Sequence, residues 1–590
     1  MPHCAGRASK PRHIDSIESE CVGSRPGAGL SAAGAFWDIA AMTAATPCVP
    51  AWLGWLLCGC LLAVPSAFGG VPDSPGQPGN GKNPQAVAEV LAGKRSVANA
   101  AWWGFNEEDA TEPLQAAIRS GAKRVVVPNL GKDWMVRPLQ LAGGQELVLE
   151  AGVVVTAMRG AYRGGGESVF NANDLTNLTI QGYGATVRMQ KEDYIVGKVL
   201  KDMGWHRWFG PYEKAEWRMT LAIRGCAGVQ VRGLTLRDSG GDGIIVQGTA
   251  KRNYSKDIHL KDLVCDNHYR QGLSVISVDG LLVEDSTFRN TWGTPPSSGV
   301  DLEPDTPAER LKNVVFRRCL FEDNYGDGIE VFLANQTRVS EDVSVLFDQC
   351  RVTSRRGAGI RVARVGDDGP GGLIEFRDCE VAGTVGYGLK VRDKSADRAR
   401  VRFTRCHVKD AASNRNFADV WAPVVLEASA SDRQRKLGGV EFVDCRVEDT
   451  HARPALVARS ESGLFDVAGT LTVVNPRGLQ ADLGEKQEGV TLRVIQTGTP
   501  AVRHVKVYAV PGRFGGWPAL RPARHRRAHG LLRQWPSRLP GVPDGIQAGW
   551  PRGQAALRPH ERRRSHLEVC LVDCARSERL RDHALYGAAG

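Results

Sequence analysis

The sequence predicts an all-β protein built as a parallel β-helix, and two repeating patterns support this prediction. In the first pattern, a glycine is followed by an aliphatic residue, any residue and a second aliphatic residue, as in GDGIIV and GDGIEV. The glycines are separated by 29, 27, 29, 31 and 29 residues, at Gly243, Gly272, Gly299, Gly328, Gly359 and Gly388. This regular period, with two or three short strands in each repeat, is typical of a solenoid of stacked coils.

The second pattern is an alternating strand that recurs between the glycine motifs. Its copies include VQVRGLTLRD, IHLKDLVCDN, VVFRRCLFEDN and VEFVDCRVED, and they end in residues that favour turns. No helical pattern separates the strands, which excludes a parallel sheet with crossover helices. The aliphatic residues of the glycine motif should form two inward columns, one from Ile244 to Leu389 and the other from Val246 to Val391.

The second strand carries five cysteines in one register, each three residues after a phenylalanine. The cysteines are Cys319, Cys350, Cys379, Cys406 and Cys445. Because the sequence shows neither a CxxC pair nor clustered histidines, a zinc site is disfavoured. We expect these cysteines to fill the interior as small apolar side chains, with bridging between neighbouring coils as the alternative.

The charge of the chain is concentrated at one end. The net charge is +11, but residues 511–590 contain 15 Arg, no Lys and 6 acidic residues, and residues 1–41 are neutral. Residues 42–510 therefore carry only +2. A nearly neutral body gives no reason to expect a nucleic-acid partner.

Both ends of the chain differ from its middle. The apolar run Ala51 to Val64 has the length of a signal-peptide core and is too short to span a bilayer, so we expect a signal peptide over 42–69 and export of the protein. Translation is then expected to start at Met42, which makes residues 1–41 a mis-called upstream extension, and 70–96 a linker. The Arg-, Pro- and Gly-rich tail over 511–590 is expected to be disordered or frame-shifted, which leaves 97–510 for the β-helix.

Residues 97–200 resemble the opening of the pectate-lyase superfamily. The segments that carry the resemblance are WWGFNEEDATEPLQAAIRSGAKRVVVP, LVLEAGVVVTA and NANDLTNLTIQGYGATVRM. In that superfamily, an amphipathic LQxAI helix caps the first coil. With the coil repeats, the likeness covers about residues 97–460. It implies a single-stranded right-handed parallel β-helix, a solenoid with an N-terminal capping helix.

Within the superfamily the chain is most similar to polygalacturonase-type glycoside hydrolases. Those enzymes carry an N-T-D-G-I/F box, an Asp-Asp pair on the next coil, and G-H-G and R-I-K motifs. Here only Asp242-Gly243-Ile244 matches the box; the next coil has Arg270-Gln271-Gly272, and the other motifs are missing. The resemblance therefore implies the fold more specifically than the activity.

The candidate catalytic residues are carboxylates on one face of the predicted helix. In a β-helix, outward side chains of adjacent coils lie ~5 Å apart and form a flat or grooved face. Asp301 and Glu330 fall in the same outward column, with Glu303 and Asp305 close by, and Asp242 and Asp327 precede it at the turn. Repulsion between such carboxylates raises the pKa of at least one, as a general acid requires. As alternatives, the turn residues only shape the bend, and Arg361 and Lys390 neutralise the column as a solvated salt ladder.

Two further groups of residues could bind a sugar. His268, Tyr269 and Arg270 lie just before the strand on the coil next to the acidic patch. The insert WHRWFGPYEKAEWRM supplies aromatic rings that could stack on sugars or instead cover the edge of the core; its tryptophans are Trp205, Trp208 and Trp217.

Three functions fit these residues. The first is hydrolysis of a polysaccharide by an exported enzyme, with Asp301 and Glu330 as the leading pair and no required cofactor. The second is a lyase or epimerase with Tyr269 or His268 as the base, Arg270 as charge neutraliser, and Ca²⁺ held by the cluster Asp301, Glu303 and Asp305. The third is a surface protein that binds glycans without cleaving them. In each case we expect a monomer without a stable membrane span.

Overall fold

The computed structural model describes residues 81–194, 212, 215–416, 420–432 and 435–497. The predicted extension 1–41, the signal peptide 42–69 and the tail 511–590 lie outside these residues, as do Trp205 and Trp208. Among the residues described, no helix is long and apolar enough to span a bilayer.

The described part begins with two helices. Helix α1 (Pro84–Leu91) starts at Asn83, whose side chain accepts a hydrogen bond from the Ala86 amide, and proline occupies its first turn. The linker prediction for 70–96 is therefore wrong over this helix. After strand β1 (Val97–Asn99) and the short helix η1 (Ala100–Trp103), α2 (Thr111–Arg119) buries Leu114, Ala117 and Ile118 against the first coil. This is the capping helix that the sequence predicts.

One sheet, here called sheet B, contains a single strand from each coil. Its strands, in their order across the sheet, are β4 (Leu139–Gln140), β7 (Phe170–Asn173), β9 (Leu221–Arg224), β11 (Ile244–Gln247), β14 (Leu273–Val275), β17 (Val300–Leu302), β20 (Asp327–Phe332), β23 (Ala358–Ala363), β26 (Leu389–Arg392), β29 (Val424–Glu427), β31 (Leu456–Arg459) and β33 (Ala481–Asp482). Neighbouring strands are parallel, and each comes from the next coil along the chain.

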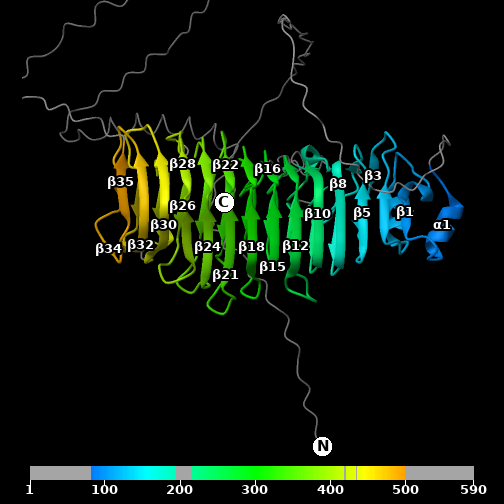
Figure 1. The fold of residues 1–590 in the computed structure, drawn as a ribbon, viewed down its shortest axis with the longest axis horizontal. Helices are drawn as coiled ribbons and strands as arrows, with labels where there is room; N and C mark the ends of the chain where they lie inside the picture. The colour runs from blue at the N-terminus through cyan, green and yellow to red at the C-terminus, as the bar shows by residue number, and fades with distance from the viewer. Residues whose placement is uncertain (1–80, 195–211, 213–214, 417–419, 433–434, 498–590) are drawn as a thin grey trace, which may run out of the picture. The chain divides into compact units, whose positions relative to one another are not determined.

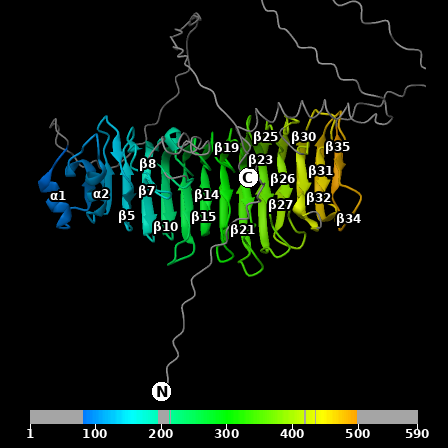
Figure 2. The ribbon, with the colours of Figure 1, turned by 180° about the vertical axis from the view of Figure 1, so that it is seen from behind.

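The other sheet, sheet A, receives two short strands or one long strand from most coils. Its strands are β1, β2 (Arg124–Val127), β3 (Trp134–Val136), β5 (Gln145–Leu149), β6 (Val154–Ala157), β8 (Thr176–Arg188), β10 (Ala227–Arg237), β12 (Ser255–Lys261), β13 (Val264–Asp266), β15 (Val278–Glu284), β16 (Thr287–Arg289), β18 (Leu311–Arg317), β19 (Leu320–Glu322), β21 (Val343–Asp348), β22 (Arg351–Thr353), β24 (Gly372–Arg377), β25 (Glu380–Ala382), β27 (Arg400–Thr404), β28 (His407–Lys409), β30 (Leu437–Glu448), β32 (Leu464–Val474), β34 (Gln487–Glu488) and β35 (Arg493–Thr497). A short helix, η2 (Ala430–Asp432), follows β29. Figures 1 and 2 show the coils following one another in chain order.

A bend separates the paired strands of sheet A within a coil. The bend residue has a φ of 49° to 56° at Asp262, Asp285, Arg318, Gln349, Asp378, Arg405 and Asp444. Aspartate tolerates this left-handed conformation well, whereas arginine does so less readily. Two of the bend arginines pair with bend aspartates on the preceding coil, Arg318 with Asp285 at 2.7 Å and Arg405 with Asp378 at 2.6 Å.

The interior consists of stacked columns, as the repeats predict. The aliphatic columns from Ile244 to Leu389 and from Val246 to Val391 are buried and in register. Beside them, a phenylalanine ladder has ring centroids 4.6 to 5.4 Å apart, formed by Phe316, Phe347, Phe376, Phe403 and Phe442. The cysteines are buried and unbridged, and their thiols donate to backbone carbonyls, for example Cys379 Sγ to Phe347 O at 3.4 Å. The prediction that they fill the interior is confirmed.

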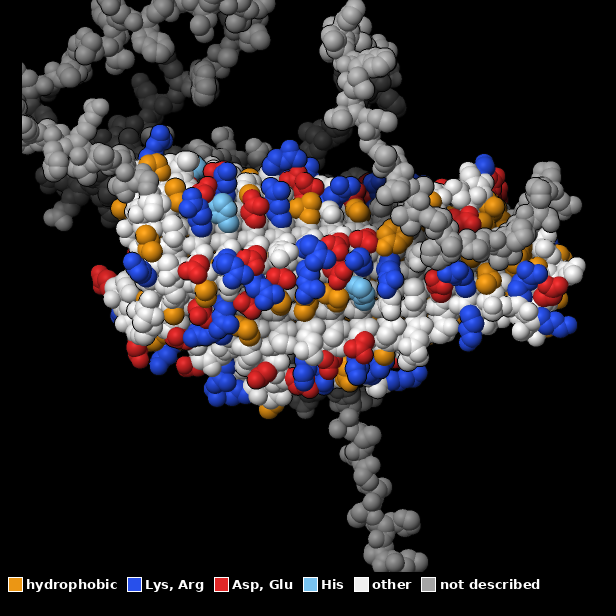
Figure 3. All heavy atoms as spheres, in the orientation of Figure 1, with side chains coloured by type: hydrophobic (Ala, Val, Ile, Leu, Met, Phe, Trp, Pro, Cys, Tyr) orange, Lys and Arg blue, Asp and Glu red, His pale blue; other side chains and the backbone are white. Residues whose placement is uncertain are grey.

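Charged side chains of both signs run in rows across the face seen in Figure 3. On sheet A, Asp348 pairs with Arg317 at 3.3 Å and with Arg377 at 2.9 Å, so one carboxylate bridges coils on either side. This intermixing agrees with the low net charge of the body.

Candidate active site on the outer face of sheet B

The predicted carboxylates lie on the outer face of sheet B. The strand register places Ile245, Ser274, Asp301, Glu330, Arg361 and Lys390 in one column on successive coils. The predicted pairing of Asp301 with Glu330 on adjacent coils is therefore confirmed. However, both side chains are buried, with 1% of Asp301 and 3% of Glu330 exposed, so the column is not the open face that the sequence suggested.

A second column, polar at all of its positions but one, accompanies the first. It is formed by the residue before each repeat glycine, namely Asp242, Gln271, Ser298, Asp327, Ala358 and Tyr387. Backbone hydrogen bonds hold this column in register, for example from Gly243 N to Gln271 O at 2.8 Å and from Gly299 N to Asp327 O at 3.0 Å. Sequence reasoning recognised only its two aspartates, although the spacing of the glycines identifies every member.

The two columns contact each other diagonally, from one coil to the next. The Gln271 amide donates to Asp301 Oδ2, and the Ser298 hydroxyl donates to Glu330 Oε2 at 3.2 Å. On the next diagonal, Asp327 Oδ2 lies 2.8 Å from Arg361 Nε. In these three cases the residue before the glycine faces the outward residue of the following coil.

Asp301 and Glu330 have opposite electrostatic surroundings. Burial raises the pKa of Asp301 well above its usual range, and the neighbouring carboxylates of Glu330 and Glu303 raise it further. Glu330 forms an ion pair with Arg361. This arginine is the partner that the salt-ladder alternative predicted, but the pair is buried rather than solvated.

Asp327 is held at the other end of the same cluster. Tyr387 donates to its Oδ1 at 2.6 Å. Burial raises the pKa of Asp327 to about 6, because the opposing effect of Arg361 is only partial and Glu330 adds repulsion. Tyr387 is a member of the site that sequence reasoning missed.

Arg270 lies among three carboxylates at the N-terminal side of Asp301. Its guanidinium nitrogens are 3.7 Å from Asp242, 3.6 Å from Glu303 and 3.6 Å from Glu216, which sequence reasoning also missed. Asp242 is fully buried, and burial raises its pKa to about 7 despite the nearby arginine. Burial also raises the pKa of both Glu303 and Asp305.

The remaining predicted residues are placed differently. His268 is fully buried, its ring Nδ1 is 2.8 Å from Ser239 Oγ, and burial and Lys191 lower its pKa to about 3. Tyr269 is also buried and lies against Gly293. The expectation that these two side chains face an open groove is therefore wrong, whereas Arg270 reaches the carboxylates. Trp217 is 52% exposed and follows Glu216 directly in the chain.

The acidic residues do not form a metal cage. Across the described ranges, no three or more His, Cys, Asp or Glu side chains are arranged to hold a metal ion. The Ca²⁺ site suggested for Asp301, Glu303 and Asp305 stays a prediction.

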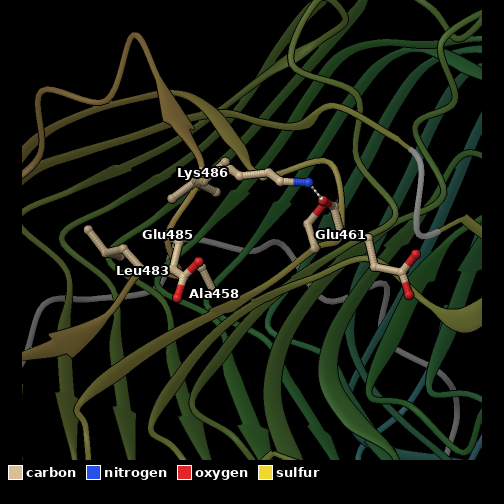
Figure 4. A pocket seen from close by; sticks show the side chains of 9 residues that line it. Ala458, Glu461, Leu483, Glu485 and Lys486 are labelled. Carbon is tan, nitrogen blue, oxygen red and sulfur yellow. Dashed lines mark hydrogen bonds between the residues drawn. The ribbon is translucent and has the colours of Figure 1, made fainter.

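Two hollows lie on the C-terminal side of these residues. One, of about 510 Å³, adjoins the carboxylates because it shares Arg361 with them; its other lining residues include Phe332, Arg364 and Arg392. The second, of about 220 Å³, lies between Ala458 and Lys486 and is shown in Figure 4, where Lys486 Nζ donates to the Glu461 carbonyl at 2.9 Å. Only the first hollow borders the carboxylate columns, so the candidate site extends toward it.

Asp242→Asn is expected to stabilise the protein increasingly as the pH rises. The pKa of Asp242 is about 7 in the folded protein and near 4 in the unfolded chain. The carboxyl therefore does not lower the free energy of unfolding below pH 4, and it lowers this free energy by the full amount above pH 7. The unfolding free energy of Asp242→Asn minus that of the wild type should therefore grow by about 2 kcal/mol between pH 5 and pH 8 in denaturant titrations.

Asp348→Asn is the control for this measurement. Hydrogen bonding from Arg377 lowers the pKa of Asp348, so its contribution is constant above pH 5 and its loss should cost stability equally at both pH values. A difference for Asp242→Asn that stays flat over the same interval would contradict the raised pKa.

The comparisons with known proteins identify the fold. A family model described as "Right handed beta helix region" matches residues 220–421. The handedness implied by the sequence resemblance is thereby confirmed, and the protein is a right-handed parallel β-helix. A comparison with curated protein sequences finds no match.

The solved structures to which the chain is similar have diverse descriptions. The family 28 exopolygalacturonase of Yersinia enterocolitica is 14% identical, with 69% of this chain and 79% of that chain covered and a TM-score of 0.43. The A-module of a mannuronan C-5 epimerase from Azotobacter vinelandii is 15% identical, with 68% and 100% covered and a TM-score of 0.43. A surface adhesin of Streptococcus pneumoniae is 12% identical, with 65% and 91% covered and a TM-score of 0.45. At these identities the likeness concerns the fold alone.

Proposed function

We propose that the protein hydrolyses glycosidic bonds, with Asp301 as the general acid and Glu330 as the nucleophile. One observation carries this proposal. Two buried carboxyls lie on adjacent coils, and burial and neighbouring negative charge favour a proton on Asp301, while Arg361 compensates the negative charge of Glu330. Paired carboxyl groups in unlike surroundings are what acid-assisted glycoside cleavage requires.

The spacing of the pair favours retention of configuration. Parallel strands are ~4.8 Å apart, and the two side chains leave their strands on the same face. This is close to the ~5–5.5 Å of a retaining pair and shorter than the ~6.5–9.5 Å of an inverting pair. Glu330 would then attack the anomeric carbon while Asp301 protonates the leaving oxygen. A water molecule that gives its proton back to Asp301 would afterwards cleave the resulting glycosyl ester and free Glu330. A polymeric glycan is met outside the cell, in keeping with the export signal predicted over 42–69.

Proton abstraction from a uronate is less well supported. His268 and Tyr269, the bases suggested for it, are both buried, and the His268 ring lies against Ser239 Oγ. Tyr387 is at the site, but burial and Asp327 raise the pKa of its phenol well above the usual value, which makes it a poor base. Binding of a glycan without cleavage is the remaining alternative.

Digestion of a glycan panel by the full chain tests the proposal. Hydrolysis should release reducing ends from at least one polysaccharide, and NMR of the first product should show the anomeric configuration of the substrate. Products with the absorbance of an unsaturated uronate would overturn hydrolysis in favour of a lyase. Binding without any new reducing end would overturn catalysis altogether.

A further inference from the structure

Four buried oxygen-bearing side chains at the N-terminal side of Asp301 have acceptors without partners. Both carboxylate oxygens of Asp242, Oε1 of Gln271, Oγ of Ser274 and Oδ1 of Asp301 make no hydrogen bond. All four side chains are at most 1% exposed. Buried polar atoms are almost always paired, so a group of unpaired acceptors on one face indicates that a donor is brought by something else.

The diagonal contacts between the two columns are missing at Asp242 and Ser274. Gln271 pairs with Asp301, Ser298 with Glu330, and Asp327 with Arg361, each across one coil. The same diagonal relates Asp242 to Ser274, which is the Cα partner of Asp301, yet neither side chain forms a hydrogen bond. At this position, therefore, the two polar side chains on the diagonal do not pair with each other.

The chemistry around this position selects the kind of ligand. Glu216, Asp242 and Glu303 surround Arg270, and Asp301 adjoins them. A ligand carboxylate has no proton to donate to the unpaired acceptors and would meet oxygen atoms on several sides. A hydroxyl group, in contrast, donates its proton to a carboxylate and accepts from a guanidinium.

Arg270 is placed to donate a hydrogen bond to such a hydroxyl group. Its three ion pairs are all 3.6 to 3.7 Å long, beyond hydrogen-bond distance, and its side chain is 17% exposed. Arg361, by comparison, lies 2.8 Å from Asp327. The guanidinium of Arg270 can therefore turn its N–H donors toward a ligand with a smaller loss of existing contacts than Arg361 would suffer.

We infer that Asp242, Gln271, Ser274 and Arg270 form a subsite for the vicinal hydroxyl groups of a neutral sugar unit, next to the bond cleaved at Asp301. This inference rests on the proposed function and narrows it to glycans that carry an uncharged sugar at this position. The sugar hydroxyls donate to Asp242 and Ser274 and accept from Arg270. A uronate carboxylate does not fit here, because it has no donor for these acceptors.

Calorimetric titration of the Glu330→Gln chain tests the subsite without turnover. Neutral oligosaccharides of xylose, glucose or mannose should include one that binds at least about 10-fold more tightly than oligogalacturonate of equal length. Adding Ser274→Ala should weaken this binding about 5-fold, as expected for one hydrogen bond to a sugar hydroxyl. Ser274→Ala should not lower the melting temperature, because the hydroxyl that it removes has no partner in the protein.

Ser286→Ala is the matched control. Ser286 is equally buried, but its hydroxyl donates to Glu284 O at 2.9 Å and accepts from Leu263 N at 3.0 Å. This variant should lower the melting temperature and leave sugar affinity unchanged.

Three outcomes would overturn the subsite. They are equal or tighter binding of oligogalacturonate, unchanged affinity in Ser274→Ala, and binding of neither class of sugar. Cleavage of uronate polymers alone by the wild type would refute the subsite and leave hydrolysis standing. Neutral binding that depends on Ser274, with no cleavage by the wild type, would refute hydrolysis and leave the subsite standing.

Discussion

Asp301→Asn is expected to lower the turnover of a cleaved glycan by about 10³-fold, the usual size of a general-acid contribution. Asparagine keeps the shape and an acceptor for the Gln271 amide, but it has no proton to give to the leaving oxygen. The wild-type rate should fall as the pH rises through the raised pKa of Asp301, because the proton required for catalysis is then lost. That alkaline limb should be absent from the residual activity of the variant.

The stability of Asp301→Asn distinguishes a catalytic role of Asp301 from a structural one. Asp301 is a buried carboxyl that carries an unpaired oxygen, so removing its ionisation should leave the unfolding free energy at neutral pH unchanged or increased. Substrates with an activated aryl leaving group, which need less protonation, should recover much of the lost rate of the first step, release of the aryl group. Full activity in Asp301→Asn would refute the site, and a large loss of stability would instead support a structural salt ladder.

Phe347→Ala is expected to cost about 3–5 kcal/mol of unfolding free energy, the usual range for a fully buried phenylalanine. Its ring is stacked between Phe316 at 4.6 Å and Phe376 at 5.1 Å, and it meets Phe321 edge-on at 6.4 Å. Because parallel coils cannot close over the missing ring without breaking register, the cavity should persist. Chemical denaturation with circular dichroism gives the measurement.

Phe465→Ala is the control for the ladder. Phe465 is only partly buried on β32 and contacts Lys436 at 5.3 Å from its ring centroid, so its loss should cost about 1 kcal/mol or less. In a solenoid each coil contacts only its neighbours, so Phe347→Ala should also open proteolytic sites near the damaged coils first. Equal stability losses in the two variants would mean that the ladder contributes no more than ordinary surface packing.

The repeats predicted the fold and the columns because period and register are local properties of the sequence. Once Gly299 and Gly328 are aligned, Asp301 and Glu330 must fall on neighbouring coils, as the structure confirms. Gln271, Ser298 and Tyr387 escaped notice because their types differ from coil to coil, although their place before the glycine is constant. Searching by position rather than by residue type would have found them.

Burial and ion pairing could not be predicted in the same way. Whether an outward residue is exposed depends on side chains and segments from other coils that pack over it, and such packing has no period. Thus the 1% exposure of Asp301 and the convergence of Asp242, Glu216 and Glu303 on Arg270 became visible only in three dimensions. The helix over Pro84–Leu91 was missed for a different reason, since its apolar face is short and lies within what reads as a connecting segment.

The buried thiols of the interior can be used to measure how fast each part of the solenoid opens. Cys226, Cys265, Cys319, Cys350, Cys379, Cys406 and Cys445 are unbridged and mark a series of coils along the stack. A maleimide can modify each of them only when its own coil opens, so peptide-resolved alkylation measures a separate opening rate at each position. If modification spreads inward from Cys226 or from Cys445, the stack frays from its ends; if Cys350 or Cys379 reacts first, the stack breaks in the middle. The same sulfur atoms that fill the core thus report the order in which it comes apart.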